Sequence, residues 1–251
     1  MMDIKIFKNV VTALFAFSLF IILLSCTTAE SNDLFTPVSL EKVRLEKEQE
    51  NVMTKLKQEQ TTAKLRIVTI NLKILEKESV NLNLFPDKNI TVVRKKIEKR
   101  SEKDFSWFGI TSDAFDSVIL VVRDNKITGT IRVGSELYRI RPLGGRKHAV
   151  IHVDQSKFPP DHPPEFEEAM KQKSDLESKM EKSIRRKDIR QNGEITYKVL
   201  VAYTPAAESD VHDIDALIQL AIDETNQSYK NSNINLTVVL AYSYRVNYTE
   251  S

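Results

Sequence analysis

The chain has 251 residues and is nearly balanced in charge, with 37 Lys and Arg against 35 Asp and Glu. This balance excludes the basic excess with which nucleic-acid-binding proteins contact phosphate, so no nucleic-acid partner is expected. The single cysteine excludes an internal disulfide framework and a multi-cysteine zinc site, and four histidines leave little room for a histidine-based metal centre.

The amino-terminal segment has the pattern of an export signal. Lys5 and Lys8 precede an almost wholly apolar stretch over residues 10–24, which is short for a membrane-spanning helix. The sequence Leu-Leu-Ser-Cys that ends this segment resembles the lipobox of bacterial lipoproteins, which implies cleavage between Ser25 and Cys26 and lipidation of Cys26. We therefore expect an exported bacterial lipoprotein, anchored in a membrane through Cys26 and facing the periplasm or the cell surface. In a Gram-negative cell this would be the outer membrane. The alternative is an uncleaved anchor helix in which Cys26 has no special role.

Residues 26–64 are expected to form a polar tether followed by a charged helix. Residues 41–64 contain few large apolar side chains among many Lys, Glu and Gln. This pattern predicts a helix that is exposed to solvent over most of its surface.

Residues 65–157 predict an antiparallel β domain. From residue 65 the pattern changes to a period of two, and Val68, Ile70, Leu72 and Ile74 alternate with polar residues, as in a half-buried strand. Further strand-like runs cover residues 90–96, 105–110, 117–123, 127–133, 137–142 and 149–154. Turn-forming residues at 124–126 and 134–135 separate neighbouring runs at hairpin spacing, which indicates a meander.

Residues 158–192 are interpreted as a Pro-rich and helical basic linker. A helical apolar spacing over residues 165–190 ends in Arg185, Arg186 and Lys187. These three residues are a candidate site of proteolytic processing, because exposed basic segments between domains are easily cleaved.

The last segment, residues 193–251, predicts a strand, a helix and a second strand in the order of a right-handed βαβ unit. Both strands, at 197–203 and 234–242, are apolar on both faces, as in a sheet covered on both sides. One helix covers only one face, and so short a segment buries too little surface to be stable alone. We therefore expect this unit to be an incomplete part of a larger domain.

Several of these strings resemble a known family. V-L-V-A-Y-T-P-A-A at residues 199–207 and E-T-N-Q-S-Y at 224–229 are similar to the opening of a reprolysin-like metallopeptidase domain, within the metzincin zinc proteases. The similarity is strongest to bacterial secreted members of the peptidyl-Asp metalloendopeptidase type. Upstream, W-F-G at 107–109 and Y-R-I-R-P-L-G-G at 138–145 resemble the β-rich propeptide of such precursors. In the family helix, Asn226 and Tyr229 are expected to have structural roles.

The resemblance implies an α+β protein. It would consist of an antiparallel β-rich propeptide-like domain at 65–157, charged linker helices, and an incomplete βαβ start of a metzincin-type α/β domain at 193–251. The basic run from Arg185 to Lys187 then becomes a candidate site of propeptide processing.

The zinc-binding motif of the family, H-E-x-x-H-x-x-G-x-x-H, does not occur in residues 1–251. The nearest string runs from His148 to His152, with Ala149 in place of the glutamate. It lies in a strand-like run, where four residues span about 13 Å, too far for both rings to bind one ion. His162 and His212 are expected to be exposed to solvent. We therefore assign no catalytic residue and no metal ligand, and expect zinc only in a full-length member of the family.

Three functions are compatible with these patterns. The first is a membrane-anchored relative of a zinc metalloendopeptidase precursor, truncated before the zinc-binding helix and inactive by itself. The second is a lipid-anchored binding or inhibitory protein, whose propeptide-like domain binds a separate metzincin catalytic domain. The third is a surface lipoprotein without a protease partner. The open edges of the βαβ unit favour the first, because exposed strand edges are a liability for a purpose-built inhibitor.

Overall fold

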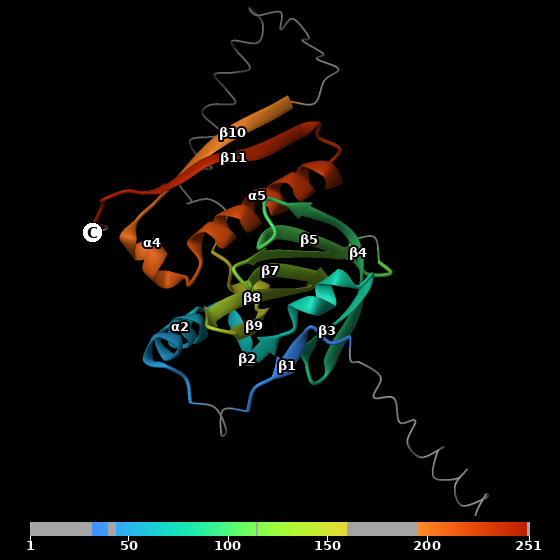
Figure 1. Cartoon of the computed structure of the whole chain (residues 1–251), viewed down its shortest axis with the longest axis vertical. Helices are drawn as coiled ribbons and strands as arrows, with labels where there is room; N and C mark the ends of the chain where they lie inside the picture. Colours follow the sequence, from blue (N-terminus) through green and yellow to red (C-terminus); the bar gives the residue numbers. More distant parts are fainter. Residues whose placement is uncertain (1–31, 40–43, 114, 160–194, 250–251) are drawn as a thin grey trace, which may run out of the picture. The chain divides into compact units, whose positions relative to one another are not determined.

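The computed structural model describes residues 32–39, 44–113, 115–159 and 195–249 (Figure 1). The largest structural element among them is a nine-stranded antiparallel sheet in the order β1-β2-β9-β8-β7-β6-β5-β4-β3. Its strands are β1 Phe35–Pro37, β2 Thr62–Ile70, β3 Ser79–Phe85, β4 Lys88–Lys99, β5 Asp104–Ile110, β6 Ser117–Arg123, β7 Lys126–Val133, β8 Glu136–Gly144 and β9 Lys147–Val153. The other elements are the helices α2 Lys47–Gln58, α4 Pro205–Asp210 and α5 Ile214–Asn231, the 3-10 turns η1 Leu72–Glu76 and η2 Gln155–Lys157, and the strands β10 Ile195–Tyr203 and β11 Leu236–Arg245.

The predicted antiparallel meander is confirmed from β4 to β9, where each strand pairs with the next along the chain. The turn between β6 and β7 shows why. Arg123 pairs with Lys126, so Asp124 and Asn125 alone make the turn, with φ values of 46° and 63°. Asp and Asn tolerate this left-handed conformation, and two such residues give the hairpin turn whose twist matches the flanking strands.

One local expectation is wrong, and one strand was not anticipated. The strand expected to continue to Ile74 ends at Ile70, and residues 72–76 turn into η1, where Ile74 and Leu75 are both buried. The Ile74 N–H donates to the Asn71 carbonyl at 3.1 Å, a local turn contact that replaces the pairing with a neighbouring strand. Strand β3 was not predicted, although its burial alternates along its whole length.

The inner face of the sheet encloses the main core, which includes Trp107, Leu120, Ile131 and Ile140. The sheet is nearly closed, because its two edge strands, β1 and β3, approach each other. The Asn83 side chain joins them: its Nδ2 donates to the Phe35 carbonyl at 2.6 Å, and its Oδ1 accepts from the Phe35 N–H at 3.2 Å. An amide that both donates and accepts in this way replaces a pair of ladder hydrogen bonds.

Helix α2 is exposed over most of its surface, as expected, but one of its faces is buried. Its Val52 and Leu56 are buried against the outer face of the sheet, in a second cluster with Leu137, Leu143 and Ile151. Its buried polar residue, Gln49, donates from Nε2 to the Gly144 carbonyl at 3.1 Å and accepts from Lys147 Nζ at 3.0 Å. The polar residues therefore form one exposed face of the helix, while three residues at spacings of three and four attach it to the sheet.

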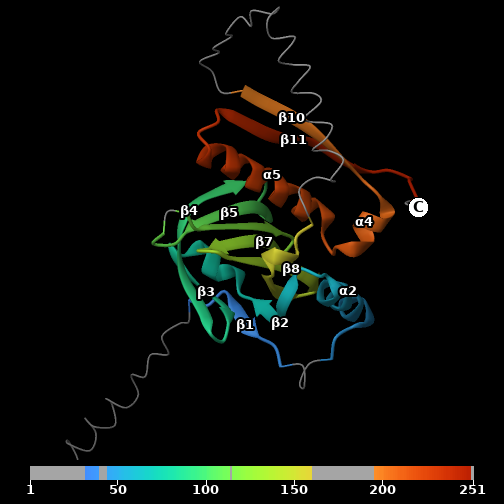
Figure 2. The same ribbon diagram turned by 180° about the vertical axis from the view of Figure 1, so that it is seen from behind.

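The predicted βαβ order of the last segment is confirmed, since β10 and β11 pair in parallel. Helix α5 lies between this pair and the large sheet, as the two opposite views show (Figures 1 and 2). The strands keep apolar side chains exposed: Tyr197, Leu200 and Tyr242 are 55%, 59% and 64% exposed.

Candidate functional site: the interface between helix α5 and the sheet

The apolar centre of the interface is a small cluster on the outer face of the sheet. Ala216 and Leu220 of α5, each only 2% exposed, pack on Phe108, Ile119 and Val121. These three residues belong to β5 and β6. The alternation of the strands sends Leu120 and Val122 inward to the main core and Ile119 and Val121 outward to the helix. Helix α5 on the outer side of the sheet therefore explains why the neighbouring strands β5 and β6 are apolar on both faces.

Ion pairs close the interface at the start of α5. Asp213 is the N-cap, and its Oδ1 accepts from the Ala216 N–H at 3.1 Å. Its other oxygen lies 3.1 Å from Lys126 Nζ, and Asp215 Oδ2 lies 2.6 Å from an Arg123 guanidinium nitrogen. Carboxylates in the first turn interact favourably with the positive end of the helix dipole. Here they also form ion pairs with the two cations of the β6–β7 hairpin.

A buried polar contact lies further along the helix. Asp223, 4% exposed, accepts a hydrogen bond from the Ser106 hydroxyl of β5, and also one from Gln219 Nε2 at 2.9 Å. Ser106 in turn accepts from Arg100 at 2.9 Å. Burial raises the pKa of Asp223 above its ordinary value, and the hydrogen bonds from Ser106 and Gln219 oppose this shift. Burial of the charged carboxylate therefore costs free energy, and the two hydrogen-bond donors offset this cost only in part.

The opposite side of α5 holds the parallel pair of strands. The Asn226 side chain donates to the Val238 carbonyl at 2.8 Å and accepts from the Val238 N–H at 2.7 Å. Asp215 also accepts from the Ser243 hydroxyl at 3.0 Å. The structural role expected of Asn226 is confirmed. The same helix thus binds the large sheet on one side and β11 on the other.

We expect the substitution Asp223→Asn to flatten the dependence of stability on pH without releasing α5. A carboxyl group whose pKa is raised by folding destabilises the protein above that pKa, and this penalty disappears as the pH falls through it. The amide removes the charge. Its oxygen can still accept from Gln219, and its NH2 group can donate to the Ser106 oxygen, which reverses the direction of that hydrogen bond. Asp223→Ala is the matched control: it leaves these groups unsatisfied and should cost about 1–3 kcal/mol. Urea unfolding between pH 4 and 8 measures both. Equal slopes for Asp223→Asn and wild type would contradict the proposed origin of the penalty.

Comparison with known proteins identifies relatives of the chain. It is 32% identical over 239 residues to a peptidyl-Asp metalloendopeptidase of Stenotrophomonas maltophilia strain K279a, a match that covers 89% of this chain and 56% of the relative. The protein of the same name from Xanthomonas campestris pv. campestris is 29% identical over 206 residues, with 76% and 48% covered. The chain is related to metalloendopeptidases. It spans about half the length of these relatives. No protein-family model matches it.

In the present chain, His148 and His152 belong to the sequence that is most similar to the zinc-binding motif. Both side chains contact other residues of the β domain. His148 is fully buried, and its Nε2 accepts from the Ile127 N–H at 3.0 Å while its Nδ1 lies 3.2 Å from the Arg146 carbonyl. Both ring nitrogens therefore already have partners. His152 stacks on Tyr138 with ring centroids 4.9 Å apart. Among the described residues, no group of three or more His, Cys, Asp or Glu could hold a metal ion.

The other residues singled out from the sequence have different outcomes. His212, expected to be exposed, is half-buried beside α2, with its Nδ1 3.7 Å from Glu48. Ser25, Cys26, His162, Arg185, Arg186 and Lys187 lie outside the described residues. Within the described ranges, no helix has the length and hydropathy that crossing a membrane requires. The contact between Ser106 and Asp223 was not anticipated, since nothing in the local sequence links two residues 117 positions apart.

Proposed function

We propose that the chain is a membrane-anchored relative of a zinc metalloendopeptidase precursor, in which the nearly closed sheet is a pro-domain that binds the peptidase segment through α5. The observation that supports this is the composition of the interface. A buried apolar centre, at Leu220 and Val121, is bordered by the Asp213–Lys126 ion pair and the buried Ser106–Asp223 contact. Such a combination of apolar anchor and satisfied polar groups is typical of a specific interface.

The proposal includes an anchored, exported location. Lipidation of Cys26 would attach the body to a bacterial membrane, the outer membrane in a Gram-negative cell, and leave it in the periplasm or at the cell surface. Cleavage at Arg185, Arg186 or Lys187 would separate the sheet from the peptidase segment. The partners proposed are therefore the membrane and a metzincin catalytic domain, with no nucleic acid.

The lipid anchor has a direct test. When the full chain is expressed in a bacterium fed radiolabelled palmitate, we expect label in the protein and recovery in the membrane fraction. Cys26→Ser should lose the label, and Ser31→Ala serves as a matched control near the same site that keeps it. Label that persists in Cys26→Ser would contradict lipidation at this residue.

Enzymatic activity is tested with purified residues 26–251 that carry Cys26→Ser. Because residues 1–251 contain no H-E-x-x-H sequence, we expect no stoichiometric zinc and no hydrolysis of casein by these residues alone. One zinc per chain with chelator-sensitive cleavage would overturn this expectation.

The same preparation separates the pro-domain from the inhibitor alternative. Since the chain's own α5 already covers Ile119 and Val121, a separate enzyme would find the interface occupied. We therefore expect no inhibition when the chain is added to an active peptidyl-Asp metalloendopeptidase. Stoichiometric inhibition would favour the binding or inhibitory lipoprotein instead.

A further inference from the structure

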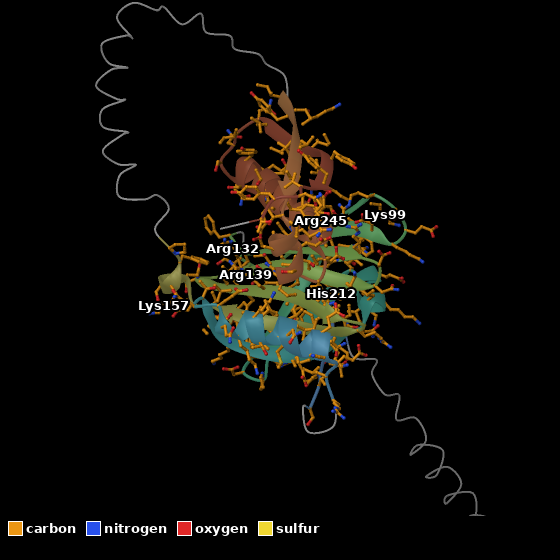
Figure 3. All side chains as sticks on the ribbon, turned by 90° about the vertical axis from the view of Figure 1, so that its left-hand side faces the viewer. Lys99, Arg132, Arg139, Lys157, His212 and Arg245 are labelled. Atoms are coloured by element: carbon orange, nitrogen blue, oxygen red, sulfur yellow. The ribbon has the colours of Figure 1, made fainter. Side chains whose placement is uncertain are left out.

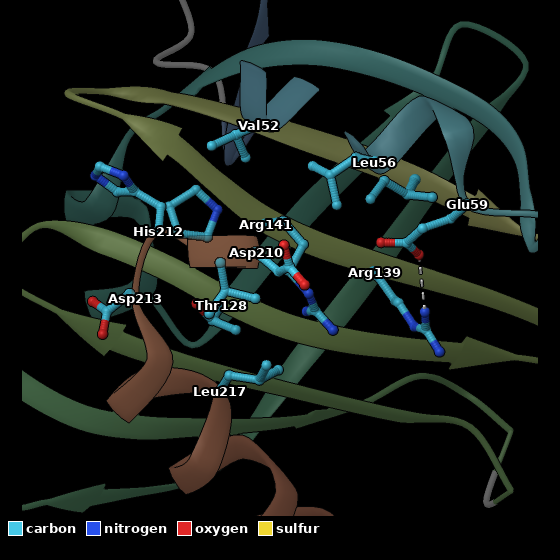
Figure 4. Close-up of a pocket in the computed structure, with 13 residues that line it drawn as sticks. Val52, Leu56, Glu59, Thr128, Arg139, Arg141, Asp210, His212, Asp213 and Leu217 are labelled. Atoms are coloured by element: carbon cyan, nitrogen blue, oxygen red, sulfur yellow. Dashed lines mark ion pairs between the residues drawn. The ribbon is translucent and has the colours of Figure 1, made fainter. Parts of the chain in front are cut away.

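A cavity of about 280 Å³ lies on the outer face of the sheet, between α2 and the α4–α5 region (Figure 4). Figure 3 gives the side view, with Arg139 and His212 labelled near this region. The walls of the cavity are largely apolar, with Val52 and Leu56 from α2, Ile151 from β9 and Leu217 from α5. Its volume is at the lower limit for cavities that bind small molecules.

Two arginines and a threonine form the polar part of the cavity. Arg139 and Arg141 are two residues apart on β8, so both extend from the same face of the sheet, and Thr128 lies on the adjacent strand β7 (Figure 4). Arg139 has a carboxylate partner, since its guanidinium lies 3.7 Å from Glu59.

Arg141 has no such partner among the described residues. One of its guanidinium nitrogens donates to the Gly129 carbonyl at 3.3 Å and to the Ile140 carbonyl at 3.0 Å. These neutral acceptors use a minority of the five N–H donors and leave the positive charge uncompensated. Burial lowers the pKa of Arg141 to about 10, so the group is still charged at neutral pH.

The acidic side chains that line the cavity form ion pairs with cations other than Arg141. Asp210 pairs with Lys55 at 2.8 Å, and Asp213 pairs with Lys126 at 3.1 Å. Glu59 and Glu224 attract Arg141 only through space. The Thr128 hydroxyl is also buried without a hydrogen-bond partner in the described part of the chain. A half-buried cation without a carboxylate in contact and a buried hydroxyl without a partner are costly, and a ligand that satisfies both would reduce that cost.

We infer that this cavity binds a small organic monocarboxylate with a short aliphatic body. One uncompensated guanidinium matches one negative charge, and its planar donor fork fits a carboxylate in a bidentate manner. The Thr128 hydroxyl donates to the same carboxylate, and the aliphatic body lies along Leu56 and Leu217. Such a group is supplied either by a free acid or by the carboxyl terminus of a peptide.

Calorimetric titration of residues 26–251 with Cys26→Ser tests the site. The probes are 4-methylpentanoate, its neutral amide, an acetylated dipeptide that ends in leucine with a free carboxylate, and inorganic phosphate. We expect saturable binding of the acid and at least a tenfold weaker response to the amide. Tighter binding of the dipeptide would identify a peptide as the source of the carboxylate. Equal binding of the acid and the amide, no binding of either carboxylate, or tighter binding of phosphate would overturn the inference.

Substitutions assign the binding to the cavity. Arg141→Met keeps the length of the side chain and should weaken binding at least tenfold, whereas Arg132→Met, at an exposed position on β7, should leave it unchanged. Thr128→Val preserves the shape of the side chain and should weaken binding a few-fold, which keeps the test open if Arg141→Met does not fold. Wild-type affinity in both Arg141→Met and Thr128→Val would place the ligand elsewhere.

Discussion

Leu220→Ala is expected to weaken the attachment of α5 to the sheet by about 2–4 kcal/mol, the usual cost of truncating a buried leucine. Leu220 is 2% exposed and fills the apolar centre between Phe108, Ile119 and Val121. A helix of this length has little stability without tertiary contacts. Amide hydrogen exchange measured by mass spectrometry should therefore show loss of protection in residues 214–231 and retained protection in β9.

Ser228→Ala is the matched control for this experiment, because Ser228 is exposed on the same helix. It should leave the exchange of α5 unchanged within a few tenths of a kcal/mol, as surface substitutions do. If Leu220→Ala kept wild-type protection throughout α5, the apolar cluster would not be what holds the peptidase segment. The proposed pro-domain role would then lose its physical basis.

The order of strands β4 to β9 was predictable from the sequence because alternation and turn residues agreed there, whereas the pairing of β2 with β9 was not predicted. In β6–β7, for example, the apolar runs and Asp124-Asn125 specify the same hairpin. Strand β3 was missed because Asn81 and Asn83 have low strand propensity. Their role is long-range: the Asn83 side chain joins β3 to β1 at the edge of the sheet.

Helix α2 shows a different limit of prediction from the sequence. The few apolar residues of α2 suggested a solvated helix, yet Val52 and Leu56 are enough to bury one face once Gln49 bonds to Gly144. Gly144 can adopt its φ of 110° because it has no side chain, and this exposes the carbonyl that Gln49 needs. Helix propensity and hydrophobic periodicity do not reveal a long-range partner such as the Gly144 carbonyl.

The interface and the cavity could not be derived from local patterns. Ser106 and Asp223 read as ordinary polar residues, and only the fold brings them together in the interior. Arg139 and Arg141 were recognised as part of a string shared with precursors of the family. Their position beneath the gap between two helices depends on elements from both halves of the chain.

His148 is expected to make the fold sensitive to acid. Burial lowers its pKa from 6.5 to about 4, and the nearby positive charge of Lys126 acts in the same direction. The neutral ring accepts the Ile127 N–H through Nε2, so a proton at that nitrogen would face a donor. Below the unfolded-state pKa the unfolded chain binds the proton first. Stability is therefore complete above about pH 6.5 and falls by about 3 kcal/mol as the pH approaches 4.

His148→Gln isolates this contribution, because the glutamine carbonyl can accept the Ile127 N–H but cannot be protonated in this range. At pH 7 the variant should be less stable than wild type, since the smaller side chain packs less well in the core. The gap should shrink by about 2–3 kcal/mol between pH 7 and 4.5, as urea unfolding of the two proteins would measure. His152→Gln on the same strand is the control for replacing a histidine that does not accept the Ile127 N–H. A constant gap between wild type and His148→Gln at both pH values would mean that His148 is not the neutral acceptor that its contacts indicate.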